Sequence, residues 1–127
     1  GGTTYIRAQE ALKDLKGENA DEQTGINIVC RAIEEPLRQI IANAGGEGAV
    51  VVNNVREGKG DYGYNARKDV YEDLRAAGVI DPAKASRVAL ENAASIAGMF
   101  LTTECLIVDK VEDTPAMPAA PGMGGMM

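Results

Sequence analysis

The chain of 127 residues is long enough for one modest domain with a hydrophobic core. Its formal net charge is −6 and it has no basic stripe, which argues against nucleic-acid binding through phosphate contacts. It has no histidine and no Cys-x-x-Cys pair, so we expect no metal site. It also contains no signal peptide and no run that would cross a membrane. Aromatic residues make up only 4% and tryptophan is absent, which favours closely packed helices built from Ala, Val, Ile and Leu.

The two cysteines and the first residues of the chain bear on its cellular compartment and its origin. Cys30 and Cys105 lie far apart, each in an apolar stretch, and we expect both to be buried thiols in a reducing compartment. The chain opens with Gly1-Gly2 rather than Met and enters a helical pattern at once. We therefore expect either a cloning scar or a piece of a longer protein.

The first part of the chain predicts two helices. Thr3–Leu15 carries an apolar stripe at helical spacing, and Gly17 ends the pattern. Asn19–Ala44 predicts a longer helix that starts with a cap at Asn19, and Glu22 is placed for a capping box. Pro36 lies inside this helix and removes one backbone hydrogen bond, so we expect a kink in the turn before it.

The middle of the chain is less regular. Residues 49–55 stay open between a strand, favoured by the β-branched run AVVV, and a short helix, which NNVRE would continue equally well. Residues 58–63 are rich in turn formers, and residues 62–66 are compatible with the edge of a small hairpin. Residues 69–78 predict one short helix.

A long apolar helix follows this middle region. Asp81 is a good N-cap and Pro82 suits the first turn. The next roughly 20 residues have almost no polar face, which predicts a buried central helix. Cys105–Val108 is a strand-type run without a partner in the chain, so we expect its partner in a missing part or in another subunit. Residues 110–127 are rich in Pro, Gly, Ala and Met and predict a flexible tail.

One short motif imitates a dinucleotide-binding site. The run GKGDYG at 58–63 matches the three-glycine pattern, and Asp81 follows near the position of a ribose-binding acid. However, Asp61 would place a negative charge beside the pyrophosphate, and Tyr62 is bulky where a helix should pack on a strand. We therefore interpret the motif as a glycine-rich surface turn, with a dinucleotide-binding enzyme as an alternative.

Five stretches of the sequence, taken in order, resemble one family. They are GGTTYIRA, GINIVCRAIEEPLRQIIANAG, DYGYNA, GVIDPAKASRVALENAASIAGMFLTTECLIVD and GMGGMM. They are similar to the C-terminal half of the equatorial domain of a group I chaperonin, the bacterial sixty-kilodalton type. The resemblance implies a mainly α, multi-helix equatorial domain that is incomplete, with a small β-hairpin and a short C-terminal strand. It assigns residues 1–109 to the ATP-binding equatorial domain and residues 110–127 to a disordered Gly/Met-rich tail.

The resemblance also implies a function. It indicates an ATP-dependent protein-folding chaperone of the bacterial cytoplasm, a homo-oligomer of two stacked heptameric rings with a co-chaperonin lid and unfolded polypeptide substrates. Mg²⁺ and K⁺ are expected in the full-length protein, with ligands outside this segment. The phosphate loop and the aspartate that positions water also lie outside it, so we expect no catalytic residue here and no ATP hydrolysis by this chain alone. The alternative is a non-enzymatic helical interaction module.

The resemblance implies an adenine and ribose site. Gly1 matches a glycine turn that lies against the nucleotide, where a missing side chain allows close approach. Asn65 and Ala66 match a segment that contacts adenine, and Arg67 follows with a possible backbone role. Asp81 matches an aspartate that accepts hydrogen bonds from the ribose hydroxyls.

Two contact surfaces are implied as well. One is a ring-to-ring surface, in which Ala20 stands where the family often has an acid. The other is a terminal strand that pairs with a hairpin of the neighbouring subunit. The ring-to-ring residues are Arg38, Glu47, Ala49 and Val50, and the strand residues are Cys105, Leu106, Ile107 and Val108.

Overall fold

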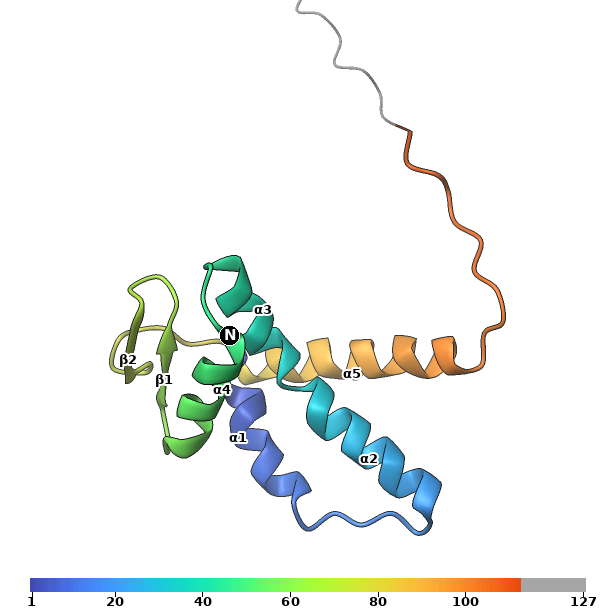
Figure 1. The fold of residues 1–127 in the computed structure, drawn as a ribbon, viewed down its shortest axis with the longest axis horizontal. Coiled ribbons are helices and arrows are strands. Elements are labelled where there is room, and N and C mark those ends of the chain that lie inside the picture. The colour runs from blue at the N-terminus through green and yellow to red at the C-terminus, as the bar shows by residue number, and fades with distance from the viewer. Residues whose placement is uncertain (113–127) are drawn as a thin grey trace, which may run out of the picture.

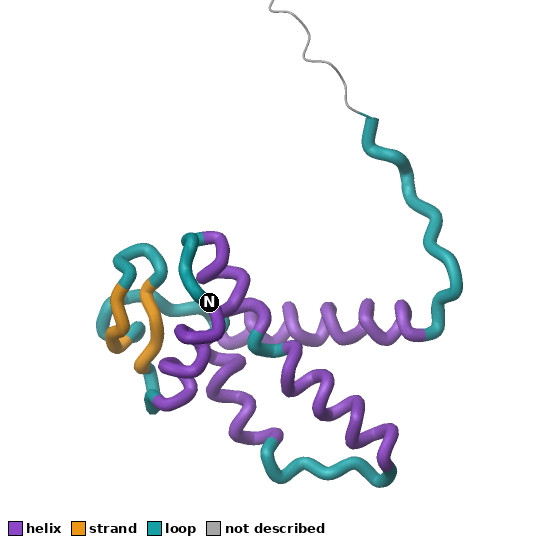
Figure 2. Tube along the Cα trace, viewed as in Figure 1, coloured by secondary structure: helices purple, strands orange, loops and turns teal. Residues whose placement is uncertain are grey.

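The computed structural model describes residues 1–112, so most of the tail predicted over 110–127 lies outside the described residues. Their fold is mainly helical with one two-stranded antiparallel hairpin, as predicted (Figures 1 and 2). In chain order the elements are α1 (Thr3–Leu12), α2 (Ala20–Ala32), α3 (Glu35–Asn43), α4 (Gly48–Glu57), β1 (Tyr62–Asn65), β2 (Val70–Asp73) and α5 (Ala83–Leu101).

The hydrophobic core lies where α1, α3 and α4 meet, beside the hairpin (Figure 1). Each helix contributes apolar residues that repeat at helical spacing, so one face of each is buried. Tyr64 and Tyr71 of the hairpin pack against this core from the side. The buried members of the core are Ile6, Leu37, Ile41, Val51, Val52 and Val55.

The long helix predicted over 19–44 is divided into α2 and α3. Asn19 caps α2 as predicted, because its side chain accepts a hydrogen bond from the backbone N–H of Glu22 at 2.9 Å. The chain leaves α2 after Ala32, and Pro36 lies in the first turn of α3, where its missing N–H has no cost. The predicted kink is therefore a complete break, which lets α3 turn toward the core.

Residues 49–55, which the sequence left open, form most of α4. The side chain of Glu47 accepts from the backbone N–H of Ala49 at 3.3 Å and starts the helix. Helical spacing then points Val51, Val52 and Val55 into the core, and this burial outweighs the β preference of the valines. A dinucleotide site needs a strand before its glycine motif, so the helix in that place makes the dinucleotide alternative wrong.

The helix predicted over 69–78 is wrong. Val70–Asp73 instead forms β2, which pairs with β1 in the register Tyr62↔Asp73 to Asn65↔Val70. Asp69 enters the strand with a positive φ of 56°, a conformation that aspartate tolerates in tight turns. The ring of Tyr71 stacks on Tyr62 with centroids 6.0 Å apart, and this cross-strand contact stabilises the extended conformation of β2.

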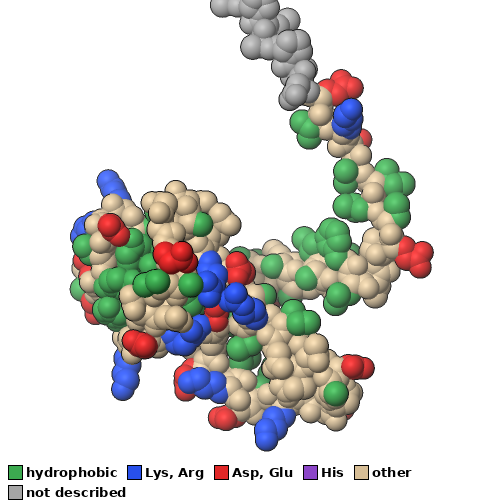
Figure 3. Space-filling view, viewed as in Figure 1, with side chains coloured by type: hydrophobic (Ala, Val, Ile, Leu, Met, Phe, Trp, Pro, Cys, Tyr) green, Lys and Arg blue, Asp and Glu red, His purple; other side chains and the backbone are tan. Residues whose placement is uncertain are grey.

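The prediction of a buried α5 is also wrong for the described residues, since none of its residues is buried. The helix extends away from the core, and apolar side chains line it and the segment that follows (Figures 1 and 3). Phe100 is 56% exposed and Leu101 is 88% exposed. No helix in residues 1–112 is long and apolar enough to cross a membrane.

Two local predictions fail as well, the cap at Asp81 and the burial of the two cysteines. Pro82, not Asp81, occupies the N-cap position, and no side chain caps the helix. Cys105–Val108 pairs with no strand of residues 1–112, so its predicted pairing with a segment outside them stays a prediction. Cys105 is exposed and Cys30 is only half-buried, so the predicted burial of both thiols is wrong.

Arg7 joins α1 to the start of the hairpin. Its guanidinium donates to the backbone carbonyls of Val55 at 2.6 Å, Gly60 at 3.0 Å and Tyr62 at 2.6 Å. The first carbonyl lies in the last turn of α4, so the cation also complements the negative end of that helix. Arg7 therefore fixes the glycine-rich turn between α4 and β1.

Replacing Arg7 by Lys should destabilise the protein although the charge is kept. A single ammonium nitrogen cannot reach three carbonyls on three segments, and the carbonyls left without a partner cost about 1–3 kcal/mol of unfolding free energy. Urea unfolding would measure the loss, with Arg87→Lys on the exposed face of α5 as the matched control. Equal stability of the two variants would contradict the assigned role of Arg7.

Candidate functional site

The two leading glycines lie directly against α3. A Cβ atom added to Gly2 would come within 2.8 Å of the backbone nitrogen of Leu37, and Gly2 has a positive φ of 91°. A Cβ atom on Gly1 would lie 2.9 Å from Cδ1 of Ile40. Gly2 therefore requires glycine, whereas a side chain at Gly1 would only displace the end of the Ile40 side chain.

Asp81 lies beside this glycine turn. Its Oδ2 atom is 3.2 Å from the backbone nitrogen of Gly1, and its side chain is 54% exposed. The chain before it is fixed by a hydrogen bond from the N–H of Val79 to the carbonyl of Leu74 at 2.8 Å. Since Asp81 does not cap α5, its carboxylate has room to accept further hydrogen bonds.

The turn of the hairpin is organised by Asn65, which is 5% exposed. Its Oδ1 accepts from the backbone N–H groups of Arg67 at 3.1 Å and Lys68 at 3.3 Å. Its Nδ2 donates to Oε1 of Glu72 at 2.7 Å. These three partners fix the orientation of the buried amide and engage the N–H of Arg67, while Ala66 and Arg67 line the adjoining hollow.

Two hollows meet at Gly1 and Val79. The first, of about 520 Å³, is lined by Asp81 together with Gly1, Arg7 and Asp61, among others. The second, of about 610 Å³, is lined by the hairpin turn and by α3. All five residues that the sequence predicts for the nucleotide therefore line one of these two joined hollows: Gly1, Asn65, Ala66, Arg67 and Asp81.

A second group of predicted residues gathers where α4 begins. A Cβ atom on Gly48 would come within 3.2 Å of Cα of Arg38, so α4 packs directly on the backbone of α3. This contact places Glu47, Ala49 and Val50 beside Arg38. Val50 is 55% exposed and Glu47 is exposed, whereas the Arg38 side chain is only 24% exposed, so the patch faces outward mainly through residues 47 and 50.

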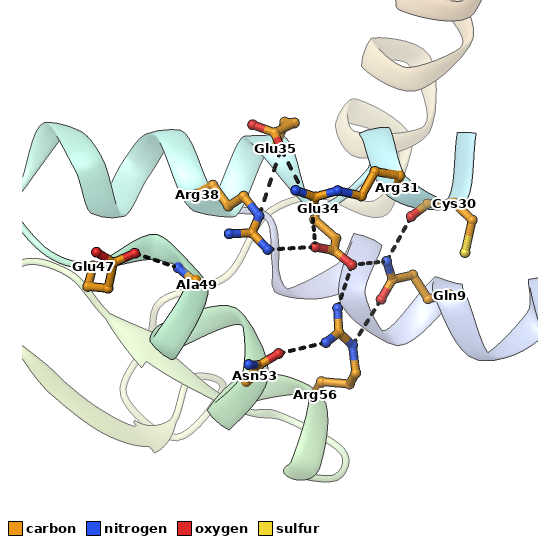
Figure 4. A network of polar contacts seen from close by, with 10 residues as sticks. All are labelled: Gln9, Cys30, Arg31, Glu34, Glu35, Arg38, Glu47, Ala49, Asn53 and Arg56. Carbon is orange, nitrogen blue, oxygen red and sulfur yellow. Dashed lines mark hydrogen bonds and ion pairs between the residues drawn. The ribbon is translucent and has the colours of Figure 1, made fainter. Parts of the chain in front are cut away.

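Sequence reasoning missed a polar network centred on Glu34 (Figure 4). Oε2 of Glu34 accepts from Arg31 at 2.7 Å and from Arg38 at 3.0 Å. Oε1 accepts from Arg56 of α4 and from Gln9 of α1, the latter at 3.0 Å. Arg31 and Arg38 lie three and four residues from Glu34, a spacing that indicates ion pairs from the sequence alone. The contacts to Gln9 and Arg56 could not be predicted, because they depend on the fold.

Glu34 stays charged in this network. Burial opposes the charged form and raises its pKa, but hydrogen bonds from Gln9 and Arg38 and the charges of Arg56 and Arg31 outweigh that effect. The net result is a pKa below the ordinary value of glutamate. In the hairpin, the Tyr64 hydroxyl donates to the Asp69 carboxylate, and this bond raises the pKa of Tyr64.

Comparison with known families identifies the chain. The profile of the TCP-1/cpn60 chaperonin family matches residues 1–111. The chain belongs to the TCP-1/cpn60 chaperonin family. The match includes both glycines, the hairpin and Asp81, and it supports a general role of this chaperonin chain as a chaperone.

Replacing Asn65 by Asp in this chaperonin should destabilise the hairpin. The new carboxylate would face Glu72 instead of donating to it, and we expect a loss of about 1–3 kcal/mol at neutral pH. The double variant Asn65→Asp/Glu72→Gln should recover most of the loss, because the amide of Gln can donate again. Thermal unfolding would measure all variants, with Glu72→Gln alone as the control, and equal midpoints for the single and double Asn65 variants would refute this pairing.

The lowered pKa of Glu34 predicts a dependence of stability on pH. A group whose pKa is lower in the folded than in the unfolded state contributes stability that is complete above the unfolded pKa. That contribution is lost as the pH falls through the folded pKa. Between about pH 6 and about pH 3 the unfolding free energy should therefore fall more steeply for the wild type than for Glu34→Gln. Parallel curves in urea unfolding would show that Glu34 carries no such linkage.

Proposed function

We propose that this chain forms the adenine and ribose side of the ATP site of a group I chaperonin, an ATP-driven protein-folding machine. The observation that carries the proposal is the meeting of two hollows at Gly1 and Val79, with Asp81 on one side and the Asn65 turn on the other. A cleft of this kind accepts a flat base on one side and a sugar on the other.

Each wall of the cleft offers suitable chemistry. The Asp81 carboxylate accepts hydrogen bonds from both ribose hydroxyls, and charged acceptors make the stronger hydrogen bonds. The bare backbone at Gly1 admits the sugar and the first phosphate to close range. Ala66 and Arg67 line the other hollow, where their backbone carbonyls meet the edge of the base.

ATP with Mg²⁺ and K⁺ belongs to the proposed reaction, but we assign no metal ligands here. Residues 1–112 contain no group of three or more His, Cys, Asp or Glu side chains that could hold a metal ion. The role of this chain is to bind and orient adenine and ribose, and phosphoryl transfer is assigned to residues outside it. The chain alone is proposed to be inactive in ATP hydrolysis.

The proposed assembly is two stacked heptameric rings of identical subunits in the bacterial cytoplasm, with a co-chaperonin lid and unfolded polypeptides as substrates. Arg38, Glu47, Ala49 and Val50 form the proposed contact between rings, supported by their gathering on one outward patch. Residues 105–108 are proposed to pair with a neighbouring subunit, which suits an apolar segment whose Ile107 is 92% exposed. The exposed face of α5 likewise suits an assembly rather than an isolated domain.

Asp81 provides the test of this proposal. In the intact protein, Asp81→Ala should weaken ATP binding by about 10- to 100-fold, because a charged acceptor of two hydroxyls is lost. The wild type should bind ATP more tightly than 2′-deoxy-ATP, and this preference should shrink in the variant. Isothermal titration would measure both affinities.

Asp61→Ala is the matched control, since Asp61 is a second carboxylate that lines the same hollow. It should leave both affinities within about twofold of the wild type. If Asp81→Ala keeps the full preference for ATP over 2′-deoxy-ATP, Asp81 does not bind the ribose, and the proposed cleft loses its central contact.

A further inference from the structure

One buried carboxylate is shared by the helices that form the core. Glu34 lies between α2 and α3 and is 8% exposed. It binds Gln9 of α1 and Arg56 of α4, and Gln9 also donates to the carbonyl of Cys30 at 2.8 Å (Figure 4). Arg38, one turn further along α3, completes the set. The network thus joins four helices through the two oxygens of a single side chain.

Arg38 depends on this carboxylate for its position. Its Nη2 atom is 3.0 Å from Glu34, whereas its Nε atom is buried and has no hydrogen-bond partner among the described residues. The nearest other carboxylate is Glu35, which lies 3.8 Å away and is 62% exposed, so it can contribute little. Without the charge of Glu34, the guanidinium of Arg38 has no strong partner to hold it.

The same short helix carries both proposed sites. Leu37 and Ile40 of α3 lie directly under the glycine turn at Gly2 and Gly1, while Arg38 lies under the start of α4. Glu34 accepts hydrogen bonds from Gln9 of α1 and from Arg38 of α3. These two contacts connect the glycine turn, where α1 begins, with the patch at the start of α4. Neither Gln9 nor Arg38 is a member of the apolar core cluster.

We propose that Glu34 is the positioning residue for the ring contact, holding the Arg38 guanidinium at the outward patch and fixing α3 against α1. The inference rests on the proposed function, in which Arg38 belongs to the surface between rings. Glu34 touches neither ring partner nor nucleotide; it acts through Arg38. Arg31 and Arg56 bind the same carboxylate and keep it charged and fixed in direction.

The test compares ring stacking in variants of the intact protein. Native mass spectrometry and sedimentation would measure the association of two rings over a range of salt concentrations. Arg38→Ala should lower the association constant by about tenfold, since it removes a charged hydrogen-bond donor. Glu34→Gln should cause a similar loss, and the double variant should lose no more than Arg38→Ala alone. Glu35→Gln is the matched control and should change the constant by less than about twofold.

The double-variant comparison separates positioning from general stability. If Glu34 had only a structural role, Glu34→Gln would lower the unfolding temperature. Ring association would then be unchanged, or the losses of the two single variants would add up in the double variant. If Glu34→Gln does not fold, Glu34→Asp replaces it, because its shorter side chain cannot reach Arg38 and Arg56 together and should also weaken stacking. Normal stacking in a folded Glu34 variant, with weakened stacking in Arg38→Ala, overturns this inference alone. Normal stacking in Arg38→Ala overturns both the inference and the proposed ring contact.

Discussion

The structure depends on the close approach of two chain segments, the glycine turn and the start of α4, to α3. The glycine turn crosses α3 closely because Gly2 lacks a side chain, and at the start of α4 a side chain on Gly48 would crowd the backbone of Arg38. Leu37 and Ile41 are almost completely buried in the resulting contact. A helix of nine residues thereby fixes the glycine turn on one side and the outward patch on another. Neither surface could shift without the other while the core stays packed.

Local sequence signals predicted the parts of the fold that local physics decides. The cap at Asn19, the break before Pro36 and the strand at Tyr62–Asn65 each follow from a few neighbouring residues. The helix α4 and the strand β2 do not, because their conformations are fixed by burial against other segments. The valines of α4 are buried against Ile6 of α1 and Leu37 and Ile41 of α3, and Tyr71 in β2 depends on cross-strand stacking.

The candidate site likewise combines features that were predicted from the sequence with features that depend on the fold. The five residues implied for adenine and ribose line two hollows that share Gly1 and Val79, and their role in nucleotide binding stays a prediction. Resemblance did not reveal how Asn65 is held, since Glu72 reaches it only through the register of the hairpin. Nor could it reveal the Glu34 network, whose partners Gln9 and Arg56 are 25 and 22 residues away in sequence. Such contacts exist only once the helices have packed.

The failed cap at Asp81 makes the site more suitable for a ligand rather than less. An N-cap carboxylate would direct its oxygen at the backbone N–H groups of its own helix. Here Pro82 takes the N-cap position, and the carboxylate is directed toward the glycine turn. The local pattern predicted that Asp81 caps α5, and the family resemblance implied that it binds ribose. The geometry contradicts only the cap. A half-exposed carboxylate beside a bare backbone retains the hydrogen-bonding capacity that a capping residue would have used.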